Sequence, residues 1–272
     1  MIATSALLAE TITIDSPRPL ADAVEQIAKL SGPAINYEDV RVLNGADIQD
    51  VTDQISRKQV GPNDKRSLGP RGGKLSAQII VDPTTQTLPD VMSAQNALNA
   101  VVNAYNTSGL PGKFKIALGN MSGALYVAPT AERNSTGQTV SFTPVLSSRI
   151  TLQAVKQTAY VTLEAILGEV SKVSRQKVAM GMIPFRAFAV AEVTIGADNE
   201  PANDVLARLF DAVSKAGADV NNVIPAMSYD MLYDPQWGYA FNILVIPNPN
   251  IKQPLPAQQT PPVNDGRFNS KP

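Results

Sequence analysis

The chain contains neither cysteine nor histidine. Without these residues it has no thiolate nucleophile, no disulfide, no imidazole base and none of the usual ligands of structural zinc, haem or iron–sulfur clusters. Most familiar catalytic chemistries are thereby excluded, so we expect a protein that is not an enzyme and that uses no cofactor and no metal ion. The absence of cysteine also favours an oxidising compartment, where a free thiol is a liability.

The chain also lacks an excess of charge of either sign and lacks long apolar runs. Lysine and arginine number 23 against 24 for aspartate and glutamate, which gives a net charge of −1. A chain with this balance has no overall field that attracts nucleic acid, and we expect no nucleic-acid partner. No 18 apolar residues follow one another, so the sequence predicts no membrane span.

The first nine residues, Met-Ile-Ala-Thr-Ser-Ala-Leu-Leu-Ala, are apolar and small. They resemble the end of a secretory signal and its cleavage site, although a mobile terminus without a targeting role is the alternative. Together with the lack of cysteine, this stretch predicts an extracytoplasmic location, either periplasmic or secreted.

At 272 residues and 44% hydrophobic content, the chain can form one large core or two smaller ones. The pattern favours two, because the order strand, helix, strand, strand, helix, strand, strand occurs twice. We therefore predict an α+β fold of two tandem related modules, at residues 10–130 and 139–246, joined by a polar linker at 131–138.

The first module is read from apolar residues that alternate in strands and recur every three or four positions in helices. Its expected elements are a strand at 11–15, a helix opened by Pro19, strands at 34–37 and 75–81, a helix capped by Ser93 that ends before Gly109, and a hairpin of 114–118 with 124–128.

The second module repeats this order without the long polar insertion that the first carries at residues 43–74. Its expected elements are a strand at 149–155, a helix spanning Leu163 and Val173, strands at 178–182 and 185–195, a helix capped by Asn199 and ended by Gly217, and a hairpin of 227–233 with 239–246.

A proline-rich tail follows at residues 247–272, with 7 of the 21 prolines. This composition predicts an extended or disordered segment, because it cannot form a hydrogen-bonded ladder or bury enough apolar surface to offset its ordering entropy.

The insertion divides into an acidic and a basic part. Residues 38–53 carry five carboxylates against one arginine, a net charge of −4, and residues 57–74 carry six basic residues against one aspartate, a net charge of +5. Guanidinium groups and glycine N–H groups in the basic part could bind an anion, although neighbouring opposite charges could simply pair. The candidate binding residues are Arg57, Lys58, Lys65, Arg66, Arg71 and Lys74.

A second candidate site lies in the last predicted hairpin. Trp237, the only tryptophan, falls in its turn, and Tyr239 follows. Such rings could stack on a saccharide or anchor a partner, because they offer a wide apolar contact at small entropic cost. The alternative is a hydrophobic clamp within the hairpin itself.

The N-terminal residues resemble a known family. The run Ile12-Thr-Ile-Asp-Ser-Pro-Arg-Pro-Leu20, then Ala23, Ile27 and Leu30-Ser-Gly32, and then Ile35-Asn-Tyr37, is similar to the short N-terminal domain shared by secretins and TonB-dependent receptors. The insertion at 43–74 departs from that family. The whole chain, in strings such as Arg149-Ile-Thr-Leu152, also looks like hypothetical exported bacterial proteins of the acidobacterial kind. The resemblance implies a small periplasmic interaction module and nothing catalytic.

These observations predict a non-catalytic exported adaptor that binds a protein of the cell envelope or associates with itself. Addition of a partner strand to a sheet edge is the most economical way for it to bind. The alternative is a binding protein for an anionic or saccharide ligand, at the basic part of the insertion or at the Trp237 turn.

Overall fold

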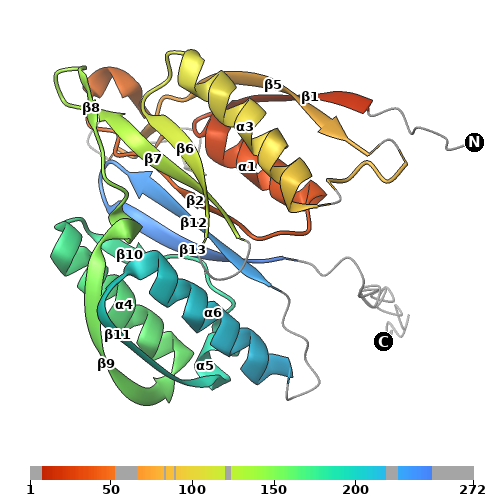
Figure 1. Ribbon diagram of the computed structural model, residues 1–272. Coiled ribbons are helices and arrows are strands. Elements are labelled where there is room, and N and C mark those ends of the chain that lie inside the picture. The colour runs from red at the N-terminus through yellow and green to blue at the C-terminus, as the bar shows by residue number, and fades with distance from the viewer. Residues whose placement is uncertain are drawn as a thin grey trace, which may run out of the picture.

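The chain has an α+β fold, as predicted (Figure 1). The computed structural model describes residues 8–52, 66–82, 84–88, 90–119, 124–218 and 226–246. None of the helices in these ranges is both long and apolar enough to cross a membrane.

The first half contains the predicted strands and helices at nearly the predicted positions. The second helix is capped by Asp90, whose carboxylate accepts a hydrogen bond from Ser93 N, and not by Ser93 itself. The elements are β1 (Leu8–Ser16), α1 (Pro19–Leu30), β2 (Ile35–Glu38), η1 (Gly45–Asp47), β3 (Ile48–Asp50), β4 (Leu68–Pro70), β5 (Gly73–Val81), α3 (Val91–Thr107), β6 (Lys113–Leu118), β7 (Leu125–Arg133) and β8 (Thr139–Ser141).

The second half follows the same order with one additional short helix. Its elements are η2 (Val145–Ser147), β9 (Arg149–Thr158), α4 (Ala159–Ser174), β10 (Val178–Met180), α5 (Phe185–Val190), β11 (Glu192–Pro201), α6 (Ala202–Ala218), β12 (Met227–Asp234) and β13 (Gly238–Val245).

Two predictions in the second half are wrong. The run 185–195, expected to be one strand, begins as helix α5, because a short run that is apolar throughout fits a helix as well as a strand. Asn199 does not cap the next helix: it lies in β11 with a positive φ of 51°, beside a register shift, and α6 begins at Ala202. Asparagine tolerates this left-handed conformation better than most residues.

Each half pairs its strands in the same way. A two-stranded antiparallel ribbon forms from β1 with β5 and from β9 with β11. In the first half β7 pairs parallel with β2 and antiparallel with β6, and in the second half β13 pairs parallel with β10 and antiparallel with β12. Two helices lie between the ribbon and the three-stranded sheet of each half (Figure 1).

The two three-stranded sheets join into one. Parallel pairing of β12 with β2 gives the order β10-β13-β12-β2-β7-β6, with β8 attached to β7. In Figure 1, α1 and α3 cover one face of this long sheet and α4 and α6 cover the other face at its other end. Each half therefore has its own apolar core, and the halves meet edge to edge through backbone pairing.

The predicted apolar positions of the helices form these cores. One core surrounds α1 and α3 and the other surrounds α4 and α6. Two predicted positions differ: Leu30 is only partly buried, at the last residue of α1, and Val173 is 48% exposed near the end of α4. Helix ends project beyond the sheet, so their apolar side chains reach solvent.

The run 131–138, predicted to be a linker, is instead part of a β-hairpin. β8 pairs antiparallel with the end of β7, where Glu132 lies opposite Val140. Glu132 is 2% exposed, and its two carboxylate oxygens accept hydrogen bonds from the Arg41 guanidinium. A buried carboxylate needs such a fixed partner, so this segment is a structural part of the first half.

The insertion at 43–74 contains a small hairpin of β3 and β4. Arg133 Nη1 donates a hydrogen bond of 2.6 Å to Asp47 Oδ1, which ties the start of this hairpin to the end of β7. Residues 53–65 of the insertion, and the tail at 247–272, lie outside the described residues.

Candidate functional site

The predicted basic site is described only in part. Arg57, Lys58 and Lys65 lie outside the described residues. Arg66 is exposed, and its Nη1 lies 3.4 Å from Asp50 Oδ2, so the basic and acidic parts of the insertion make at least one ion pair.

The other two predicted basic residues follow β4 in the chain, whereas Arg66 precedes it. Arg71 follows β4, and Lys74 lies in β5 opposite Asp15 of β1. Both side chains are exposed.

The Trp237 turn lies against the insertion. Gln236 Nε2 donates a hydrogen bond of 2.9 Å to Arg66 O, and the Lys177 ammonium lies 5.4 Å from the centre of the Trp237 ring. Trp237 is 57% exposed. The structure thus brings together two candidate sites that are about 170 residues apart in the sequence.

Tyr239 was predicted to line this site, and its position contradicts that prediction. Its side chain is 1% exposed and its hydroxyl donates a hydrogen bond of 3.2 Å to Asp39 O. In β13 it alternates with partly buried neighbours and faces the core of the second half. Tyr239 therefore stabilises the fold and is not available to a surface ligand.

A groove that the sequence did not indicate runs between β5 and α3. Its volume is about 290 Å³. One side is the edge of β5, which pairs only with β1 among the described strands. The other side is a face of α3 with small side chains. The lining residues are Gln78, Ile79, Ile80, Val81 and Asp82 from β5 and its end, and Ser93, Asn96, Ala97 and Ala100 from α3.

The chemistry of this groove is that of an unpaired strand edge beside an uncrowded helix. The unpaired edge of β5 presents backbone N–H and C=O groups to a further strand. Ala97 and Ala100 carry only a methyl group, so the space between helix and edge stays open. Ile80, on the outer face of the ribbon, is 56% exposed.

The corresponding position in the second half is closed. Leu98 of α3 and Leu206 of α6 are fully buried, and Ala100 and Arg208 each follow two residues later. Arg208 Nη2 donates a hydrogen bond of 2.9 Å to Gly196 O of β11 and lies 2.8 Å from Glu200 Oε2. A long guanidinium side chain thus occupies, beside β11, the space that an alanine leaves open beside β5.

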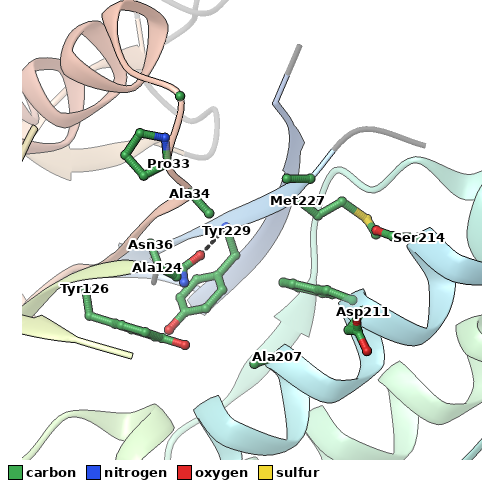
Figure 2. A pocket seen from close by; sticks show the side chains of 13 residues that line it. Pro33, Ala34, Asn36, Ala124, Tyr126, Ala207, Asp211, Ser214, Met227 and Tyr229 are labelled. Atoms are coloured by element: carbon green, nitrogen blue, oxygen red, sulfur yellow. Dashed lines mark hydrogen bonds between the residues drawn. The ribbon is translucent and has the colours of Figure 1, made fainter. Parts of the chain in front are cut away.

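A second hollow lies between the halves, under α6. Figure 2 shows Tyr126 and Tyr229 on the sheet, with Ala207 and Asp211 of α6 opposite. The cavity has a volume of about 420 Å³. On its floor the Asn36 carboxamide is already engaged, because its Oδ1 accepts a hydrogen bond of 2.9 Å from Tyr229 N.

An adjoining cavity of about 310 Å³ shares Tyr126 and Tyr229 with the first and contains Glu38. The Glu38 carboxyl accepts hydrogen bonds from Val145 N and from Leu146 N, the latter at 3.2 Å. These donors belong to η2, so Glu38 holds the start of the second half against β2. Burial raises the pKa of Glu38 to about 8.

No group of three or more acidic side chains that could hold a metal ion occurs in the part of the chain that the structure describes. The polar groups of the hollow between the halves include Asp204, Asp211 and Lys115 at its walls. Asn36 and Glu38 are both engaged in hydrogen bonds to backbone N–H groups of the second half.

The free energy of unfolding is expected to fall as the pH rises from about 4.5 to 8. Folding raises the pKa of Glu38 from 4.5 to about 8, so over this interval the folded chain holds a proton that the unfolded chain has released. For this one carboxyl the fall amounts to at most about 1.4 kcal/mol per pH unit. Burial also raises the pKa of Asp39, which acts in the same direction. Urea unfolding across this range measures the slope.

Glu38→Gln should flatten the dependence, because glutamine keeps an acceptor for the η2 N–H groups but does not titrate. Glu25→Gln, at an exposed carboxylate, is the matched control and should leave the slope unchanged. An unaltered slope in Glu38→Gln would show that this carboxyl is not its cause.

Comparison of the chain with family models, curated proteins and solved structures finds no match.

Proposed function

We propose that this protein is a non-catalytic, exported interaction module that binds a partner in the cell envelope by adding a strand of that partner to β5. In this proposal the body consists of two copies of one helix-and-sheet unit, predicted at residues 10–130 and 139–246, of which the first is extended by the end of β7 and by β8. The observation that carries the proposal is the groove of about 290 Å³ between the edge of β5 and α3. At the equivalent position of the second half the Arg208 side chain fills the space.

An extended peptide suits both walls of this groove. Its backbone would continue the ribbon of β1 and β5, which supplies affinity through main-chain hydrogen bonds. Because side chains of a strand alternate between its two faces, every second side chain would lie over Ser93, Ala97 and Ala100. The partner segment is therefore expected to carry apolar side chains of moderate size at alternate positions.

The ribbon also has the length that strand addition needs. β5 spans 9 residues, of which the four side chains that face α1 and α3 are buried. These anchored residues hold the edge rigid, so the partner alone has to be ordered on binding, which limits the entropic cost of association.

Ala100→Arg tests the proposal directly. The new side chain would occupy the groove as Arg208 does beside β11, and capture of the envelope partner should weaken at least about tenfold, a loss of about 1.4 kcal/mol of binding free energy. The measurement is affinity capture from a cell-envelope extract followed by titration of the captured protein. Backbone amides of β5 should also exchange more slowly with solvent in the complex.

Asn99→Arg is the matched control, because it adds the same side chain to the neighbouring exposed position of α3, outside the groove. It should bind like the unmodified protein, and both variants should keep the unmodified melting temperature. Undiminished capture by Ala100→Arg would rule out this groove as the binding site.

A second candidate function is binding of an anionic or saccharide ligand beside Trp237. It is favoured by the contact of Gln236 with the insertion and by the Lys177 ammonium beside the exposed indole ring. Because Trp237 is the only tryptophan, its fluorescence reports this site alone. A saturable change on titration with acidic oligosaccharides would support this function, and an unchanged spectrum would oppose it.

A further inference from the structure

Among the described strands, the long sheet has two unpaired edges. They are the counterparts of the two strands that meet in its middle. The order β10-β13-β12-β2-β7-β6 contains the same arrangement of three strands twice. In this arrangement β10 corresponds to β2 and β6 corresponds to β12, because each has the same partner in its own half. The middle junction pairs β12 with β2, and the free edges are β6 and β10.

The register of the middle junction transfers to the free edges. At the junction Met231 lies opposite Glu38 in parallel pairing. In the second half Phe241 of β13 pairs with Met231 on one side and with Met180 on the other. In the first half Val127 of β7 pairs in the same way with Ile116 and with Tyr37. At the β6 edge the residue that corresponds to Met231 is therefore Ile116. At the β10 edge the residue that corresponds to Glu38 is Gly181, which follows Met180.

The backbone is open at Met180 of one edge and at Ile116 of the other. Met182, the counterpart of Asp39 at the junction, is already engaged, because its N donates to Asn242 Oδ1 and its O accepts from Ile243 N. Lys177 O and Gly181 N bond to β13, so the backbone groups of residues 177, 179 and 181 face that strand. Because backbone groups alternate in direction along a strand, those of Met180 point outward. By the same alternation those of Ile116 point away from β7.

Hydrogen bonds within the chain engage further residues of each edge and limit its length. The Ser171 hydroxyl bonds both backbone groups of Val178, and the Asn106 carboxamide bonds both groups of Phe114. The open part of each edge is therefore short, but the middle junction is short too, with two residue pairs in register.

Apolar side chains are exposed at both edges. Leu118 in β6 is 58% exposed, and Met182, just after β10, is 72% exposed. At the middle junction other apolar side chains pack across the join: Leu232 of β12 packs against the core of the first half, and Tyr126 of β7 packs against the core of the second. Burial of such side chains is the main driving force for association.

We propose that a second copy of this chain adds its β6 in parallel to β10, so that copies assemble head to tail and continue the long sheet. The contact repeats between molecules the pairing of β12 with β2 within one molecule. Because the two joined surfaces differ, the assembly grows into an open chain or closes into a ring, according to the rotation between copies. This inference rests on the correspondence of the two halves and not on the groove of β5.

Two lysine variants of the full chain test it by sedimentation velocity over a wide concentration range. The unmodified protein should associate as its concentration rises. Leu118→Lys places a charge on the β6 edge and Met182→Lys places one beside the β10 edge, and each variant alone should sediment as a monomer. An equal mixture should form dimers and nothing larger, because the intact β10 edge of the first meets the intact β6 edge of the second.

Val155→Lys is the control, because it adds a lysine at an exposed apolar position of β9, away from both edges and from the β5 groove. It should associate like the unmodified protein. A monomeric unmodified protein at all concentrations, association of both edge variants, or loss of association in Val155→Lys would each overturn the proposal. Capture of an envelope partner by the monomeric edge variants would leave the function of the β5 groove intact while this inference is decided.

Discussion

Replacement of Asp39 by alanine should lower the free energy of unfolding by about 3 kcal/mol or more, because removal of one partner from a buried charged network leaves the others unsatisfied. The Asp39 side chain is 9% exposed. Its carboxylate accepts hydrogen bonds from the Tyr37 hydroxyl at 3.1 Å and from Val40 N at 3.0 Å, and it lies 3.4 Å from Arg18 Nε and from Tyr233 N.

The hydrogen bonds around Asp39 also connect the first half to the second. Arg18, at the start of α1, also donates to Tyr233 O at 2.7 Å, and Tyr233 belongs to β12 of the second half. With alanine at position 39 the guanidinium would lose its carboxylate in a partly buried place. We therefore expect the loss of stability to be accompanied by faster hydrogen exchange where β12 meets β2.

Urea unfolding of Asp39→Ala measures the effect, with Asp15→Ala as control. Asp15 is exposed on β1, and its replacement should change the stability by less than about 0.5 kcal/mol. Equal stability of the two variants would mean that the buried carboxylate contributes nothing to the junction.

The second large loss of stability is expected when a buried leucine is truncated in either core. Leu98→Ala and Leu206→Ala should each cost about 3 kcal/mol, because both leucines are 0% exposed and each truncation leaves a cavity in a packed core. Since the sheet continues through the pairing of β12 with β2, each variant should shift one common unfolding transition and not one of two.

Calorimetry with circular dichroism checks this prediction. Leu118→Ala, at a leucine that is 58% exposed, is the control and should change the melting temperature little. Two separate transitions, of which each core variant lowers only its own, would show that the halves unfold independently and that the shared sheet couples them weakly.

Local signals in the sequence were sufficient for most elements. Pro19 begins α1 because its fixed φ suits the first helical turn, and Ala23 and Ile27 are buried one turn apart, as their spacing predicts. The hairpin of β12 and β13 lies at its predicted place, and buried side chains alternate with partly buried ones along β13 after the turn at 234–238. These features depend on residues close together in the chain.

The errors came where a residue's state depends on a distant partner. Glu132 and Arg133 read as a polar linker, but Arg41 and Asp47, about 90 residues earlier, hold them in the fold. Tyr239 read as a surface aromatic, but the alternation of β13 turns it into the core. Arg208 gave no signal at all, because its role depends on a carbonyl of β11 that only the packing of α6 brings near.

The sequence by itself determined the α+β class, the order of the main strands and helices, and the apolar faces of the helices, because periodic spacing of apolar residues dictates local structure. The tertiary structure alone decided how the halves join, which strand edges stay unpaired, and where a groove stays open. Those properties arise from pairing between β12 and β2, nearly 200 residues apart, and from the size of single side chains such as Ala100 and Arg208 beside an edge. The spacing of residues along the chain does not indicate which distant strands pair or which side chain lies beside an edge.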